Sequence, residues 1–166
     1  KELKAYPFIT LAAPNPDAQT KQIRNIEYHN TGTRALQLDL FIPKTNQIPA
    51  PIVLLIHGGG WSSGNKEMTH PMATALCNAG FLCASVQYRL SPEAPYPAAV
   101  ADLKQAIAWM RNHATNYNGD PNQIAVLGCS AGAQLATLLG TTHQKPFYTT
   151  ETDTRNGQFA VQAIVN

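Results

Sequence analysis

Four short segments of this chain are apolar at nearly every position, and stretches with helical spacing separate them. The segments are Pro51–Ile56, Phe81–Val86, Ile124–Leu127 and Val161–Val165. Strands that are apolar on both faces are typical of parallel sheets covered by helices on both sides. Helices are expected at Lys66–Ala79, Ala98–His113 and Ala131–Leu139, with Gly80 and Gly140 ending the first and third. This alternation predicts an α/β fold with a mostly parallel sheet, right-handed crossovers and helices on both faces.

The segment before these strands has a different period. Residues Ala35–Ile42 alternate well, as in a half-buried strand, with Leu36, Leu38, Leu40 and Ile42 on one side and Gln37 and Asp39 on the other. Residues Gln22–His29 alternate weakly, and the pattern places Ile23 on the opposite face from Ile26 and Tyr28. Turn residues Asn30–Gly32 lie between the two segments. We therefore expect an N-terminal antiparallel hairpin.

Composition narrows the class of protein. The chain has 166 residues, a net charge of +2, 44% hydrophobic residues and 13% charged residues. The apolar content excludes a disordered tail, and the weak charge makes neither nucleic acid nor a membrane surface an expected partner. Three cysteines are too few for a disulfide framework. A Cys77–Cys83 bridge is the alternative to simple buried thiols, which ordinary cysteine behaviour favours.

The chain is expected to be one domain with an extended arm. Residues 1–20 contain Pro7, Pro14 and Pro16 without a sustained period, and residues 21–166 would form the domain. Thr141–Gly157 is polar and unpatterned, as in a loop. The first residue is Lys1, so the absence of a signal peptide leaves the compartment open, with a secreted or periplasmic location favoured over a cytoplasmic one.

The string Gly128-Cys-Ser130-Ala-Gly132 joins an expected strand to an expected helix. A sharp strand-to-helix turn of this kind lifts a serine hydroxyl out of the sheet, and the flanking glycines let backbone and helix approach closely. The alternative is a tight turn without chemistry. The pattern predicts a nucleophilic serine at residue 130.

A second glycine-rich string, His57-Gly-Gly-Gly60-Trp61, directly follows the apolar strand 51–56. Consecutive glycines let a loop turn its amides toward a substrate oxygen, as the oxyanion of acyl transfer requires. A phosphate cradle is the rival interpretation, but no Gly-Lys-Ser/Thr follows. Both strings would lie at the carboxyl ends of parallel strands, where open α/β sheets bind their ligands.

Three blocks together resemble one family. They are residues 57–66 (HGGGWSSGNK), 88–95 (YRLSPEAP) and 128–133 (GCSAGA). In order and separation they resemble the α/β-hydrolase serine esterases of the hormone-sensitive-lipase-like group, closest to BD-FAE (acetyl-xylan/feruloyl esterase-like) members. The resemblance covers residues 34–166 and implies an α/β-hydrolase fold acting on carboxylic esters, with small acyl groups such as acetyl, on carbohydrate or simple alkyl alcohols, as the expected substrates.

The resemblance also assigns site residues. It implies that Ser130 is the nucleophile and that the N–H groups of Ala131, Gly59 and Gly60 form the oxyanion hole. Trp61 would line the pocket, and His57 would hold the glycine loop rather than act as the base. No cofactor is implied. Nor does the sequence offer Cys or His pairs at metal-ligand spacing.

The rest of a catalytic triad is not found in the expected order. In the family an acid and then a histidine follow the serine, whereas here His143 precedes Glu151 and Asp153. His143 is therefore interpreted as a solvated loop residue. We expect the chain to be the N-terminal portion of the fold, without its C-terminal strands. The apolar edge at Ala160–Val165 would then be covered by the remaining portion or by another chain.

Two rival functions stay open. A serine peptidase of the same fold usually carries an extra domain, for which this chain has no room. A non-catalytic α/β-hydrolase-like binding protein, or an inactive fragment, would explain the missing acid and histidine.

Several polar residues are expected to have structural roles. Arg89 and Glu93 are expected to form an ion pair or to brace their loop, and Lys66 and Glu67 to begin a helix. Cys129 is expected to be packed, pointing away from the tip of the turn.

Overall fold

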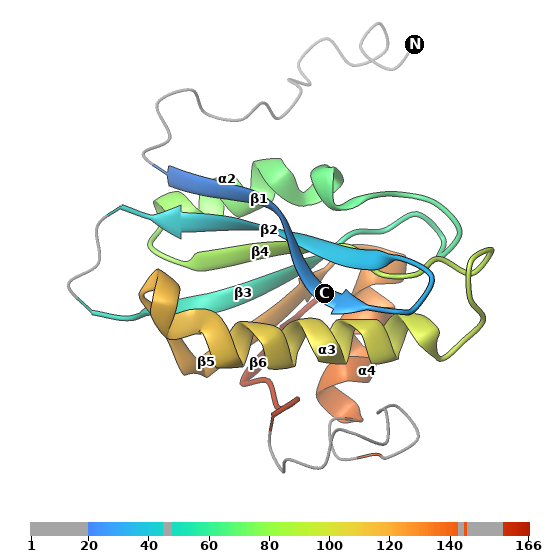
Figure 1. Cartoon of the computed structure of the whole chain (residues 1–166). Coiled ribbons are helices and arrows are strands. Elements are labelled where there is room, and N and C mark those ends of the chain that lie inside the picture. Colours follow the sequence, from blue (N-terminus) through green and yellow to red (C-terminus); the bar gives the residue numbers. More distant parts are fainter. Residues whose placement is uncertain (1–19, 45–47, 143–144, 146–157) are drawn as a thin grey trace, which may run out of the picture.

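A computed structural model describes residues 20–44, 48–142, 145 and 158–166 (Figure 1). The strands are β1 (Thr20–Asn30), β2 (Ala35–Pro43), β3 (Ala50–Ile56), β4 (Leu82–Val86), β5 (Gly119–Gly128) and β6 (Ala163–Val165). The α-helices are α2 (His70–Asn78), α3 (Ala98–His113) and α4 (Ala131–Thr141), and the 3₁₀-helices are η1 (Lys66–Thr69) and η2 (Ala114–Tyr117). Of the expected arm, all but Thr20 lies outside the described residues, as do His143, Glu151 and Asp153, so the domain boundaries stay predictions.

The described strands form one sheet in the order β1-β2-β4-β3-β5-β6. Strand β2 pairs antiparallel with both β1 and β4, and the other pairs are parallel. The predicted N-terminal hairpin and mostly parallel sheet are therefore confirmed. Because β3 and β5 are adjacent and parallel, the segments that follow them, at His57 and Cys129, emerge side by side at one edge (Figure 1).

Helices cover both faces of the sheet, as predicted. In Figure 1, α3 lies in front of the sheet and α2 behind it. The core under α3 and α4 includes Leu54 and Ile56 of β3, whereas the core under α2 includes Val53 and Leu55 of the same strand. Successive side chains of a strand point to opposite faces, so a strand buried on both must be apolar throughout.

Strand β1 departs from the alternation that its sequence predicts. Its register with β2 shifts between Ile23 and Ile26, and Asn25 there has a left-handed φ of 57°. A bulge inserts an extra residue and resets which side chains share a face. Ile23, Ile26 and Tyr28 consequently contact the same core, so the predicted separation of Ile23 from the other two is wrong.

Strand β2 is buried on both faces rather than on one. Leu36, Leu38 and Leu40 lie in the core under α3, as predicted. Asp39, on the face expected to meet solvent, is fully buried. The helical segment 66–78 covers that face, so the interpretation of β2 as half-buried is wrong.

Two helix boundaries differ from the prediction. The segment 66–79 is divided into η1 and α2 because Pro71, in the first turn of α2, lacks the N–H that would bond to Glu67. Helix α4 continues through Gly140 to Thr141. A Cβ on Gly140 would lie 2.1 Å from Ile164 Cδ1, so this glycine lets β6 approach the helix rather than ending it.

Strand β6 is the last strand of the described sheet. It pairs with β5, and its side chains Ile164 and Val165 are 40% and 48% exposed. An apolar edge is therefore present where the sequence predicts one, and what covers it stays a prediction. None of the helices in the described residues combines the length and hydropathy needed to cross a membrane.

Candidate active site

Ser130 lies between the end of β5 and the first residue of α4. Its backbone has φ 56° and ψ −119°, and the residue is exposed. A non-glycine residue in this region is strained, and such strain is maintained only where the surroundings impose it. The predicted sharp strand-to-helix turn is therefore present, with its hydroxyl accessible.

The glycines beside Ser130 allow this turn by removing side chains from two tight contacts. A Cβ on Gly128 would lie 2.1 Å from the carbonyl oxygen of Gly132, closer than any real Cβ contact. Gly132 in turn packs directly on the end of β3. Both positions therefore require glycine because backbone occupies the space of a side chain.

The loop of residues 57–65, which we call the glycine loop, packs against the serine turn. A Cβ on Gly58 would lie 2.7 Å from Cys129 O and 3.3 Å from Ser130 Cβ. Gly59, Gly60 and Trp61 all have left-handed φ angles, of 122°, 61° and 61°. The structure thus brings together the two glycine-rich strings that the sequence singles out.

Hydrogen bonds within the glycine loop fix the direction of one amide. The carbonyl of Gly59 accepts bonds from Ser62 N (3.3 Å), Ser63 N (3.0 Å) and Ser63 Oγ (2.8 Å). In a planar trans peptide the N–H points opposite to the carbonyl, so the Gly60 N–H is directed away from Ser63. Ala131 begins α4, where the helix offers its N–H no internal acceptor. Among the described residues neither amide donates to a protein acceptor, and the oxyanion roles of Gly59, Gly60 and Ala131 stay predictions.

His57 is held behind the glycine loop. Its ring stacks on Tyr88 at 4.4 Å between centroids, and Nδ1 lies 2.8 Å from Gly58 O. The Tyr88 hydroxyl donates to the His57 carbonyl at 2.9 Å. Burial lowers the pKa of His57, which favours the neutral ring. This placement agrees with a supporting role and not with that of a base.

Trp61 connects the glycine loop to two other segments. Its indole Nε1 donates to Gln134 Oε1 at 3.0 Å, and its carbonyl accepts a bond from Ser91 N at 2.8 Å. The side chain is 43% exposed, so it can contact a ligand as well. Gln134 is not among the site residues predicted from the sequence. Its position four residues after Ser130 was the available signal, since residues i and i+4 share a helix face.

The BD-FAE family model matches residues 38–166. The chain belongs to the BD-FAE family.

Similar proteins agree with this assignment. A probable carboxylic ester hydrolase, LipM of Mycobacterium tuberculosis, is 39% identical over 70% of this chain and 27% of its own. The Thermogutta terrifontis esterase Est2, native or with butyrate bound, is 28% identical with a TM-score of 0.64, covering 75% of this chain and 44% of its own. A truncated carbohydrate esterase from gut microbiota is 30% identical with a TM-score of 0.65, covering 78% and 46%. This BD-FAE chain thus spans about a quarter to a half of the length of these relatives. Its fold is that of an α/β-hydrolase.

A general base for this BD-FAE serine is not found in the described part of the chain. Within it, no hydrogen bond joins Ser130 Oγ to a histidine, and the ring of His57 is committed to Gly58 and Tyr88. His143 lies outside the described residues. The base and its acid therefore stay unassigned.

The third block of the family resemblance, residues 88–95, is fixed by two ion pairs. Arg89 pairs with Asp102 of α3 at 2.6 Å, and its main-chain N–H also donates to that carboxylate. Glu93 pairs with Arg34 at 2.5 Å. Arg89 and Glu93 therefore brace their loop, which was one of the two expected roles. The other expectation, an ion pair between Arg89 and Glu93, is wrong, because each pairs with a different residue.

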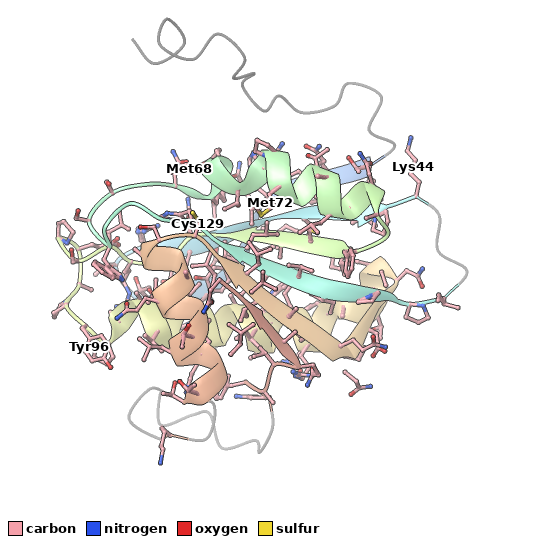
Figure 2. All side chains as sticks on the ribbon, turned by 180° about the vertical axis from the view of Figure 1, so that it is seen from behind. Lys44, Met68, Met72, Tyr96 and Cys129 are labelled. Carbon is pink, nitrogen blue, oxygen red and sulfur yellow. The ribbon has the colours of Figure 1, made fainter. Side chains whose placement is uncertain are left out.

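The cysteines occupy two environments. Cys77 and Cys83 are free and buried, so the alternative of a disulfide between them is wrong. Burial raises the pKa of Cys77 to about 11 and raises that of Cys83 as well. Cys129 is exposed at the junction of β5 and α4 (Figure 2), which contradicts the expectation that it is packed. The turn that projects Ser130 also leaves its neighbour uncovered.

An ionic cluster of buried and exposed side chains lies at η1 and the start of α2, on the far side of β2 from the main core. Donor atoms of Asp39, Glu67 and His70 lie within 4.8 Å of one another, a spacing that could hold a metal ion. Lys66 Nζ, however, donates to Asp39 Oδ2 at 2.8 Å and to Glu67 Oε1 at 2.9 Å, and Arg24 also donates to Asp39. Two protein cations already satisfy these carboxylates, so we interpret the group as an ion cluster.

Proposed function

We propose that this protein hydrolyses carboxylic esters through an acyl-enzyme on Ser130. The observation that carries the proposal is the exposed, strained Ser130 with the glycine loop packed against its turn. Ser130 Oγ attacks the ester carbonyl and loses its proton to a general base, and the alcohol leaves with a proton. Water then attacks the acyl-serine, releasing the acid and restoring the hydroxyl.

Stabilisation of the oxyanion is the step to which the described residues contribute most. The tetrahedral intermediate places a negative charge on the carbonyl oxygen, and preorganised N–H groups stabilise that charge. Gly60 N–H, which is directed away from Ser63, and Ala131 N–H at the start of α4 are the proposed donors, with Gly59 beside them. Trp61 would form one wall of the pocket.

We infer a small acyl group, on a carbohydrate or a simple alcohol, as the substrate class. The butyrate in the Est2 structure and the carbohydrate esterase among the similar structures support this inference. A chain with only 13% charged residues offers little charge to select an ionic substrate. Acetyl, butyryl and octanoyl esters of p-nitrophenol would rank acyl length, and faster turnover of the octanoyl ester would contradict the inference.

Labelling with a fluorophosphonate probe tests the nucleophile directly. The protein should be labelled and should hydrolyse p-nitrophenyl acetate, and Ser130→Ala should abolish both. Cys129→Ala is the matched control, since it alters the exposed neighbour and should leave the labelling intact. Labelling that survives Ser130→Ala would overturn the proposal by pointing to another nucleophile. Absence of any labelling would overturn it in favour of a non-catalytic binding protein.

A further inference from the structure

Lys66, the first residue after the glycine loop, is a buried cation with every donor engaged. Its side chain is 3% exposed. The ammonium donates to Asp39 Oδ2 at 2.8 Å, to Asn25 Oδ1 at 2.9 Å and to Glu67 Oε1 at 2.9 Å. An ammonium has three N–H groups, so these bonds account for all of them. Lys66 is therefore held in one position.

The acceptors are themselves fixed by other bonds. Asp39 Oδ1 accepts the Asn25 main-chain N–H at 2.7 Å, and Asp39 Oδ2 also lies 2.9 Å from His70 Nε2 and 3.1 Å from Arg24. Asn25 occupies the left-handed position of the β1 bulge. The bulge thus presents both its amide and its side chain to the cluster. The ammonium is anchored to two strands of the sheet.

The glycine loop needs an anchor at its far end, because the hydrogen bonds to the Gly59 carbonyl and those of Trp61 hold only residues 59–63. Gly59, Gly60 and Gly64 have positive φ, and glycine-rich backbone has many alternative conformations. At its first residue the loop is held by Tyr88, which donates to the His57 carbonyl. At its far end, the next residue is Lys66.

A buried ion pair is weak evidence for stability, because apolar residues of similar volume often stabilise a fold equally well or better. A buried ion pair can, however, select one geometry over others. Oxyanion donors require a placement accurate to about 0.5 Å. We propose that Lys66 is a positioning residue, which holds the amides of the glycine loop opposite Ser130 by fastening the end of the loop to Asp39 and Asn25. This inference rests on the proposed function.

The test compares two buried lysines in the whole protein. Lys66→Met removes the anchor, and Lys104→Met is the matched control, because Lys104 is fully buried on α3, where its ammonium donates to Thr142 O. Active-site titration with the fluorophosphonate gives the number of competent sites, so that kcat is expressed per site. Lys66→Met should lower kcat per site about 10- to 100-fold with little change in KM, as misplaced transition-state donors do. Lys104→Met should leave kcat per site unchanged.

Hydrogen–deuterium exchange separates this inference from the proposed function. Peptides covering residues 58–64 should exchange faster in Lys66→Met than in the unaltered protein and no faster in Lys104→Met. Unchanged kcat per site, or unchanged exchange in that segment, would overturn the role of Lys66. If the unaltered protein lacks Ser130-dependent turnover, the proposed function fails, and the exchange result still decides whether Lys66 anchors the loop.

Discussion

A Cβ on Gly132 would lie 2.2 Å from the carbonyl oxygen of Ile56, the last residue of β3. The start of α4 therefore rests directly on the strand that leads into the glycine loop. This contact sets the spacing between the two halves of the candidate site, because Ser130 precedes the helix and His57 follows the strand.

Gly132→Ala should separate these halves. The new methyl group meets backbone, which cannot rotate away, so we expect a loss of about 3 kcal/mol in the free energy of unfolding and a large loss of esterase activity. Gly80→Ala is the control, since no atom lies within 4 Å of its Cβ and only its φ of 98° is unfavourable, at about 1 kcal/mol. Urea denaturation measures both, and equal losses would show that the close approach is unimportant.

Ser130 should reduce the stability of the fold that displays it. Its φ of 56° is one that glycine adopts without strain. We expect Ser130→Gly to raise the free energy of unfolding by about 1 kcal/mol, after the flexibility of glycine in the unfolded chain is subtracted. Ser130→Ala keeps the Cβ and should gain nothing, although both variants lose activity. Equal stability of the two variants in urea would contradict the prediction.

The two ion pairs that brace residues 88–95 should differ in strength. In the Arg89–Asp102 pair the side chains are 24% and 1% exposed, whereas in the Arg34–Glu93 pair they are 38% and 32% exposed. Asp102→Asn leaves a largely buried guanidinium without its counter-ion, and should cost about 3 kcal/mol. Glu93→Gln should cost less than about 1 kcal/mol. Thermal unfolding measures the stability loss of both variants. A larger loss for Glu93→Gln than for Asp102→Asn would show that burial is not the deciding factor.

His70 should make stability depend on pH. Burial and the neighbouring Arg24 lower its pKa below the ordinary 6.5. Below pH 6.5 the unfolded chain therefore binds a proton that the folded protein does not, so stability falls as pH decreases, by at most about 1.4 kcal/mol per pH unit for this group. The measurement is urea denaturation at pH values from 5 to 8.

His70→Gln provides the comparison for this slope. The variant keeps a polar side chain near Asp39 but does not titrate, so its stability should vary less between pH 5 and 6.5. A smaller slope should persist, because burial also lowers the pKa of His57. Identical pH profiles for the variant and the unaltered protein would refute the assignment.

The burial of Asp39 could not be predicted from the pattern of its strand. The strand and its apolar face were predictable, because an apolar residue at every second position from 36 to 42 depends only on the local period. The partner of its other face was not, because the helix that covers it begins at residue 70. Burial alone would raise the pKa of Asp39, but hydrogen bonds from Lys66, Asn25 and Arg24 outweigh it and lower the pKa. A polar position in an alternating strand is therefore no proof of exposure.

Local sequence pattern alone determined the order of strands and helices along the chain, the serine turn and the glycine loop. Each of these depends on the backbone conformation of a few consecutive residues. Tertiary structure alone decided that Trp61 would bond to Gln134, 73 residues later, and that Lys66 would meet Asp39, 27 residues earlier. Such contacts arise from how the strands are ordered and which helix covers each face. No period or short motif encodes that arrangement, because it results from the packing of the whole core.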